Sequence, residues 1–133
     1  MADKEILDRL NSRCPFNKYN GITVKDLGSD WAVVEGEISP DMLNPWGTAH
    51  GAFIYGLCDV AAGVAATNMA THSSVTLSGT IYYLRPSEGT YLRAEGKVIK
   101  AGRTVVVVET NVYNDKNVHT ARGEFQIFLT DGR

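Results

Sequence analysis

Residues Ala52–Ala66 read AFIYGLCDVAAGVAA, an apolar run rich in alanine that contains a single charged residue, Asp59. The run is apolar on every side of a helical projection, so it predicts a helix that is buried all round. A carboxylate in such a helix costs several kcal/mol unless it is paired, hydrogen-bonded or open to a wet cleft. Asp59 is therefore either satisfied by neighbouring donors or used in a functional site.

The segment before this helix carries polar groups, and Asn44–Ala52 reads NPWGTAHGA. The first turn of the helix, near Gly51, has free N–H groups and the positive end of the helix dipole, which together can hold an anion or a developing oxyanion. The absence of a side chain at Gly51 lets a ligand approach the backbone closely. Asn44 and His50 either orient a bound carbonyl or cap the loop, and the local sequence leaves both roles open.

The rest of the chain is rich in strand-forming residues. The expected strands are residues 21–25, 31–38, 74–84, 91–100, 104–113 and 118–129. Short connections rich in turn formers favour antiparallel neighbours. This order predicts an α+β domain in which a curved antiparallel sheet of five to six strands wraps a long central helix. The unbroken run Val105–Val108 predicts that its strand is covered on both faces, by the helix and by a second layer such as another subunit.

Length and charge exclude several classes of protein. The 133 residues, with a net charge of −2, predict one domain over residues 1–133, with a short helical segment at residues 1–15. No basic run suggests a nucleic-acid partner. Cys14, Cys58 and the three histidines lack metal-ligand spacing, so we expect no metal and no cofactor, with Cys58 a small buried apolar residue. Without a signal peptide or a membrane-spanning run, the expected location is the cytoplasm.

The spacing of five residues resembles the signature of the PaaI-type hotdog-fold acyl-CoA thioesterases: Asn44, Gly47, His50, Gly51 and Asp59. The resemblance extends from about residue 21 to residue 129 and includes residues 81–86, residue 89 and residues 100–104. It implies the hotdog architecture and self-association as a homodimer, often with dimers paired into tetramers. The family often has His-Gly-Gly where this chain has Ala52; a backbone N–H survives there, so we expect a tuned pocket and retained chemistry.

The resemblance implies hydrolysis of an acyl-CoA thioester and a role for each motif residue. Asp59 acts as a general base toward water or as a nucleophile that forms a mixed anhydride. The Gly51 N–H stabilises the oxyanion, and Asn44 and His50 shape the loop, with Asn44 a candidate to bind the carbonyl or the water. Thr76 aligns with a hydroxyl residue that helps to hold the attacking water in the family, although a strand threonine is common for other reasons.

Coenzyme A carries phosphates, and the resemblance places its nucleotide against a strand end and a turn. The strand end supplies Tyr83, Arg85 and Pro86. The turn supplies Lys100, Gly102, Arg103 and Thr104. Cationic side chains suit phosphate binding, although a single cation in a turn is also common as a solvated surface charge.

Helix geometry gives an independent argument for a dimer if the Gly51 amide is the oxyanion site. Asp59 lies eight residues further along the helix, which separates the two Cα atoms by roughly 12 Å at 1.5 Å per residue. One chain therefore cannot supply both roles to one substrate. A second, antiparallel helix across a two-fold axis would bring Asp59 of one protomer to Gly51 of the other.

Two other functions stay open at this point. A hotdog dehydratase or hydratase would pair an acid with a histidine, for which His50 is the candidate. A non-catalytic acyl-CoA-binding module is the second alternative, but the first 20 residues are too short for an attached helix-turn-helix. The acyl group is not specified: Trp46, Phe53, Tyr55 and Met69 suit either a pocket for an aromatic or medium-length acyl chain or an ordinary core.

Overall fold

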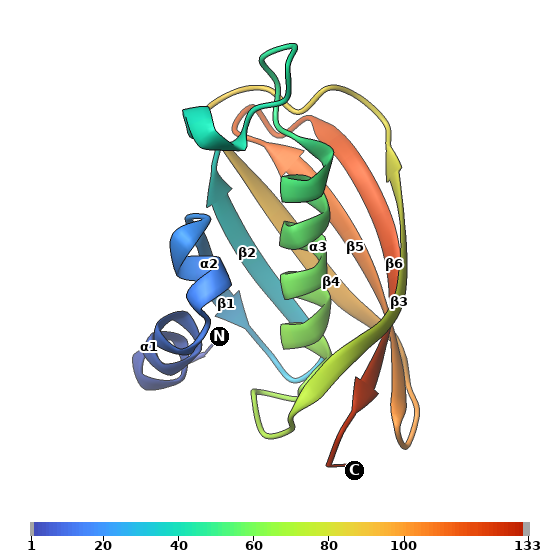
Figure 1. Ribbon diagram of the computed structural model, residues 1–133. Helices are drawn as coiled ribbons and strands as arrows, with labels where there is room; N and C mark the ends of the chain where they lie inside the picture. The colour runs from blue at the N-terminus through green and yellow to red at the C-terminus, as the bar shows by residue number, and fades with distance from the viewer. Residues whose placement is uncertain (1, 132–133) are drawn as a thin grey trace.

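The computed structural model describes residues 2–131, in which a long helix lies across one face of a six-stranded sheet (Figure 1). The elements in chain order are α1 (Lys4–Arg13), α2 (Pro15–Tyr19), β1 (Ile22–Leu27), β2 (Trp31–Glu37), the 3-10 turn η1 (Pro40–Met42), α3 (Gly51–Ala66), β3 (Ser74–Tyr83), β4 (Tyr91–Ala101), β5 (Val105–Asn114) and β6 (His119–Leu129). Neighbouring strands are antiparallel, in the order β1-β2-β4-β5-β6-β3. The predicted α+β arrangement of a helix wrapped by a sheet is confirmed.

The core lies between α3 and the concave face of the sheet. Four alanines on α3 are fully buried, at positions 61, 62, 65 and 66, and they let the helix approach the strands closely. Gly96 on β4 lies directly beneath this part of α3: a Cβ atom there would lie 2.7 Å from the carbonyl oxygen of Ala61. Small residues on both elements therefore set the distance between helix and sheet.

This close contact predicts a large loss of stability for Gly96→Ala. The added methyl group would meet helix backbone, which cannot rotate away, so α3 must shift and the free energy of unfolding should fall by about 3 kcal/mol. Gly63→Ala is the matched control, because nothing lies within 4 Å of its added Cβ. Alanine favours a helix over glycine, so this control should gain about 0.5–1 kcal/mol. Urea unfolding measures the free energy of unfolding of both variants. Equal changes in Gly96→Ala and Gly63→Ala would contradict the close packing of α3 on β4.

The prediction that α3 is buried all round is wrong for the described chain. The helix is buried toward the sheet, but a stripe at four-residue spacing is only half-buried: Gly51, Tyr55, Asp59 and Gly63. Residues four apart share one face of a helix, so the stripe is continuous. Apolar residues are distributed evenly around the helix, so the sequence did not indicate that one face is only half-buried. Asp59 thus lies at the margin of the core, where a partner or a ligand can reach it.

Within residues 2–131 only the core-facing side of Val105–Val108 is covered, and the second layer expected on the other face, such as another subunit, stays a prediction. Burial alternates along β5: Val106 and Val108 are fully buried, whereas Val105 and Val107 are half-buried on the other face. This alternation is typical of an antiparallel sheet with one face toward the core and one toward solvent.

The two edges of the sheet differ. On the outer edge of β1, the Asn11 side chain donates to the Val24 carbonyl at 3.0 Å and accepts from the Val24 amide at 2.8 Å, so α1 covers that edge. At the opposite edge, β3 has no strand on its outer side among residues 2–131, although it is ten residues long. Val75, Leu77 and Tyr82 on β3 are each more than half exposed. A long, apolar, uncovered edge strand is a ready site for pairing with another chain.

The amino-terminal segment contains two helices where the sequence predicted one helical segment at residues 1–15. Helix α1 ends at Arg13, and α2 starts at Pro15, whose fixed φ angle suits the first turn of a new helix. The two helices lie beside β1, on the same side of the sheet as α3 (Figure 1).

Candidate active site

Asp59 makes a specific contact with the edge strand. The Thr76 hydroxyl, on β3, donates to Oδ1 of Asp59 at 2.6 Å. Because Asp59 is half-buried and the other carboxylate oxygen is not used in this hydrogen bond, the group retains an acceptor for a water molecule or a substrate. Asp59 and Thr76, both predicted site residues, are 17 positions apart in the sequence, and the structure brings them into contact.

The loop before α3 is organised by Asn44. Its Oδ1 accepts from the amides of Trp46 at 2.9 Å and Thr48 at 3.1 Å, and its Nδ2 donates to the Thr48 hydroxyl at 2.8 Å. These bonds are those of a loop-ordering residue, one of the two roles that the sequence left open. Asn44 therefore fixes the backbone that leads into Gly51.

The first turn of α3 combines a capped and a free amide. His50 Nδ1 accepts from the Ala52 amide at 2.9 Å, which assigns the ring proton of neutral His50 to Nε2. The Gly51 N–H makes no hydrogen bond within residues 2–131, so it is available to an oxyanion.

Tyr83 holds the other side of Gly51. Its hydroxyl donates to the Gly51 carbonyl at 2.8 Å, and burial raises the pKa of Tyr83, so the group stays a protonated donor at neutral pH. A Cβ atom at residue 51 would lie 3.2 Å from this hydroxyl oxygen, a tight contact that favours glycine there. The end of β3 thus positions the start of α3.

The predicted catalytic acid and the predicted oxyanion donor line different cavities of the chain. Asp59 and Thr76 line a cavity of about 740 Å³ between α3, the start of β3 and the helices α1 and α2. Gly51 and Asn44 line a second cavity, of about 390 Å³, beside the end of β3. No residue is common to the two linings. A single chain therefore does not assemble the acid and the amide in one site.

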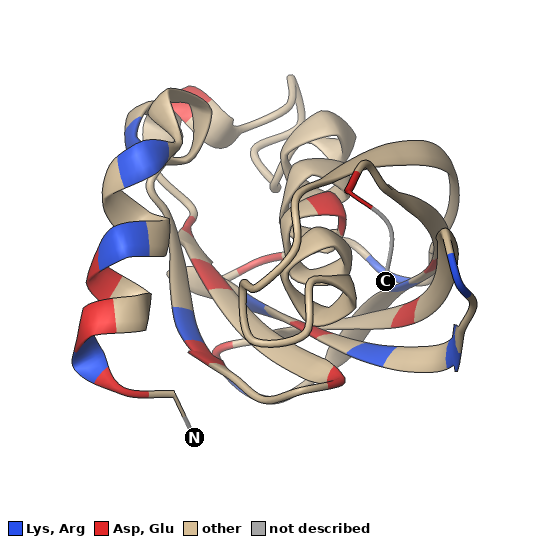
Figure 2. Ribbon diagram, turned by 90° about the horizontal axis from the view of Figure 1, so that it is seen from below, with Lys and Arg blue, Asp and Glu red and all other residues tan. Residues whose placement is uncertain are grey.

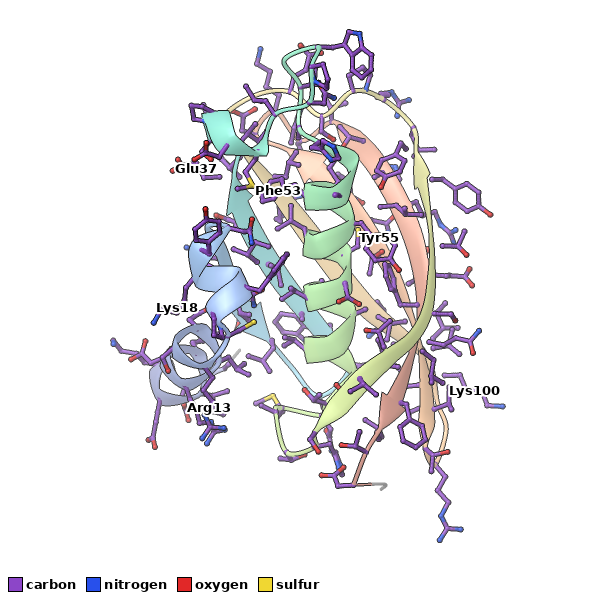
Figure 3. All side chains as sticks on the ribbon, viewed as in Figure 1. Arg13, Lys18, Glu37, Phe53, Tyr55 and Lys100 are labelled. Atoms are coloured by element: carbon purple, nitrogen blue, oxygen red, sulfur yellow. The ribbon has the colours of Figure 1, made fainter. Side chains whose placement is uncertain are left out.

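The predicted coenzyme A residues also fall into two groups. Tyr83, Arg85 and Pro86 line the second cavity with Gly51, and one Arg85 N–H donates to the His119 carbonyl at 2.7 Å. The turn between β4 and β5, which contains Gly102, Arg103 and Thr104, lies at the opposite end of the sheet from the N-terminus of α3. Figures 1 and 3 show this separation, with Lys100 labelled.

Other chemistry is limited within the described residues. Burial raises the pKa of Cys58 to about 11, so its thiol is protonated and does not act as a nucleophile at neutral pH. Within residues 2–131 we find no group of three His, Cys, Asp or Glu side chains that could hold a metal ion. In the same range, no helix has both the length and the apolar character needed to span a membrane.

Sequence reasoning missed the part that α1 and α2 play in the cavity around Asp59. Leu10 and Arg13 of α1, Cys14 between the helices, and Asn17 of α2 all line it. The sequence of these short helices contains no recognisable motif. Only the fold shows that they lie across the cavity from α3. The helical segment predicted at residues 1–15 did not specify which element it packs against.

Comparisons with known proteins agree with this geometry. The family model described as thioesterase superfamily matches residues 47–121, a range that includes Gly51, Asp59 and Thr76. The medium/long-chain acyl-CoA thioesterase YigI of Escherichia coli is 24% identical in an alignment 124 residues long that covers 80% of this chain and 80% of YigI.

Two solved structures extend the comparison. The E. coli PaaI protein from the phenylacetic acid degradation operon has a TM-score of 0.87 at 23% identity and covers 96% of this chain and 93% of its own. The structure of smu.793 from Streptococcus mutans, bound to acetyl CoA, has a TM-score of 0.77 at 29% identity over 84% of this chain and 90% of its own. The hotdog fold expected from the sequence is confirmed.

Proposed function

Because this chain belongs to the thioesterase superfamily and is therefore a thioester hydrolase, we propose that it hydrolyses an acyl-CoA ester at sites shared by two copies of the chain. The observation that carries the proposal is the separation of Asp59 with Thr76 from Gly51 with Asn44 in two cavities. The acyl-CoA thioesterase activity named for the E. coli relative and the acetyl CoA bound to the S. mutans protein support coenzyme A as the thiol carrier.

The uncovered edge of β3 supports a dimer in which two β3 strands pair. If α3 of a second copy runs antiparallel, so that Gly51 faces the partner's Asp59, the midpoint of the contact is Tyr55. On β3, Thr76 is bonded to Asp59 and Tyr83 to Gly51, and the midpoint between these two residues lies at Gly79 and Thr80.

The two midpoints are neighbours, because the Tyr55 side chain reaches from α3 to Gly79 on β3. The Tyr55 hydroxyl oxygen lies 2.6 Å from the position of a Cβ atom at Gly79, and Figure 3 shows the Tyr55 side chain between α3 and β3. A single two-fold axis near Tyr55 and Gly79 can therefore relate both the two α3 helices and the two β3 strands of the dimer. Such an axis makes two equivalent sites per dimer.

In each shared site the carbonyl oxygen of the thioester accepts the Gly51 N–H of one protomer. A single donor of this kind is worth about 2.7–4 kcal/mol in other hydrolases. Asp59 of the other protomer, held by Thr76, either removes a proton from the attacking water or attacks the carbonyl carbon itself to form an anhydride that water then opens. Collapse of the tetrahedral intermediate breaks the C–S bond and releases coenzyme A as the thiol.

In the proposed dimer, cations from both protomers bind the phosphates of coenzyme A near the end of β3 that lies beside Gly51. Arg85 lies in the Gly51 cavity and keeps N–H groups beyond the one bonded to His119. An antiparallel partner would bring Lys100, near the end of its β4, and Arg103, in the turn that follows, toward this end. Side-chain cations near phosphate bind ground state and transition state alike, because the phosphates do not react.

Removing these cations should therefore raise KM and leave kcat nearly unchanged. We expect Arg85→Gln and Arg103→Gln each to raise KM for an acyl-CoA several-fold, with a further rise at high salt in the wild type. Lys25→Gln, on the far edge strand β1, is the matched control. An acyl-pantetheine ester, which lacks the nucleotide, should show no change in KM between the variants and the wild type. Equal KM values for the pantetheine and coenzyme A esters of the wild type would argue against this phosphate site.

The activity itself is tested by a panel of short, medium, long and aryl-acyl CoA esters, with thiol release as the readout. At least one ester should turn over at a rate that depends on Asp59. Tight binding of every ester with no thiol release would favour the acyl-CoA-binding module instead.

A further inference from the structure

The cavity around Asp59 continues beyond the reacting atoms as a groove between α3 and the helices α1 and α2, hereafter the α1–α2 groove. Its volume is about 740 Å³, and α3 with the residue that follows it, Thr67, lines the groove from Asp59 onward. Eight residues of helix span about 12 Å. Asp59 stands at one end of this stretch, so the groove leads away from the site of hydrolysis along the helix.

The walls along the middle of the groove are apolar. Val60 and Val64 of α3 face Leu10 of α1 and Val24 of β1, and Gly63 leaves open space between them. Such walls suit the methylene groups of an acyl chain. The phosphates and the pantetheine amides of coenzyme A are polar, so apolar walls would contribute little to binding them.

Two cations of α1 also line the groove. Arg9 and Arg13 are four residues apart, which places them on one face of the helix, and neither forms an ion pair within residues 2–131. The remaining cation of α1, Lys4, pairs with Asp8 at 2.8 Å. Like charges at this spacing destabilise a helix slightly, so the pair is unfavourable until an anion lies between the two guanidinium groups. Figure 2, seen from below, shows the Lys and Arg bands of α1 and α2 beside α3.

A buried amide on α2 gives a second, independent observation. Asn17 lines the groove and is only 6% exposed, yet its Oδ1 has no hydrogen-bond partner. Buried polar side chains are bonded in the large majority of cases. Turning the amide over would put the Nδ2 donor in the place of Oδ1, where an oxygen of a ligand can accept from it. A polar group on a bound ligand would satisfy it.

The other ionisable groups of the groove do not cancel this charge. Asp59 is about two helical turns away from Thr67, at the other end of the groove. His72 lines the groove but contacts Asp131 at 3.2 Å. An anion that enters along α1 therefore meets two free guanidinium groups and an amide.

We propose that the α1–α2 groove binds the acyl chain and selects one that ends in a carboxylate, as in a monothioester of a dicarboxylic acid. Arg9 and Arg13 bind the carboxylate, the valines contact the methylene groups, and Asn17, with its amide turned over so that Nδ2 takes the place of Oδ1, donates a hydrogen bond. This inference rests on the proposed function. A phosphate of coenzyme A has the same charge, but the groove starts at Asp59 on the acyl side of the thioester and has apolar walls.

The test compares esters of equal length: adipoyl- and suberoyl-CoA against hexanoyl- and octanoyl-CoA. The wild type should favour the acid-ended esters in kcat/KM. The double variant Arg9→Gln/Arg13→Gln should lower the ratio of acid-ended to methyl-ended kcat/KM by about tenfold or more, the scale of lost hydrogen bonds between charged groups. Lys18→Gln, an exposed cation of α2 outside the groove, is the matched control and should keep the wild-type ratio.

Three results would overturn the proposal. The first is a wild type that prefers methyl-ended esters, and the second is an unchanged ratio in the double variant. The third is an equal loss for both ester types that disappears with acyl-pantetheine carriers, because that would assign the arginines to a phosphate. Calorimetry with non-hydrolysable thioether analogues keeps the two proposals apart. If no ester is hydrolysed, the proposed function fails, but an acid-ended preference in Kd that is lost in the double variant still supports the groove, and its absence refutes it.

Discussion

Asp59→Asn is expected to lower kcat for acyl-CoA hydrolysis about a hundredfold or more while the fold is retained. The amide has nearly the volume of the carboxylate and can still accept the Thr76 hydroxyl at Oδ1, so the 2.6 Å contact survives. It can neither take a proton from water nor attack a carbonyl. The loss therefore appears in kcat, and KM should change little because Asp59 does not contact the nucleotide in the proposed site.

The controls for this prediction separate chemistry from stability. Asp41→Asn makes the same chemical change at an exposed position in η1 and should keep full activity. Thr76→Val removes the donor to Asp59 and should cost about tenfold, the scale of a hydrogen bond to a charged group, whereas Thr76→Ser should retain most of the rate. Urea unfolding verifies that each variant is folded. A folded Asp59→Asn protein with more than about half of the wild-type kcat would refute the role of Asp59.

Much of the fold could be predicted because the sequence patterns are local. The α3 helix begins one residue earlier than expected, where His50 caps it, and the strands differ from expectation by a few residues at their ends. These elements follow from the alanine-rich run, the alternating strand residues and the turn formers between them. The hotdog arrangement and the thioesterase class were implied by the resemblance of the Asn44–Asp59 motif to the PaaI-type thioesterases.

The surroundings of the site could not be predicted in the same way. Which face of α3 stays half-buried depends on the whole sheet, in which the described residues 2–131 place no strand beyond β3. The role of Asn44 depends on three hydrogen bonds within one loop, which composition does not specify. The position of Asn17 in the groove depends on a second short helix, which the Pro15 break allowed but which no periodic pattern indicated.

The shared site is the central claim, and subunit exchange tests it most directly. Asp59→Ala removes the acid, and Asn44→Ala removes the three bonds that order the loop before Gly51, so each homodimer should lose nearly all activity. In a mixed dimer, one shared site carries both defects and the other carries neither. With free exchange of equal amounts, about half of the dimers are mixed and each has one intact site of two, so about a quarter of wild-type activity should return.

Different tags on the two variant subunits confirm that exchange takes place and give the fraction of mixed dimers. The measurement is the rate of thiol release from an acyl-CoA before and after the two inactive proteins are mixed. Our account predicts recovery to about a quarter of the wild-type rate. Complete exchange with no recovery would contradict it, because sites built within one chain carry a defect in every subunit.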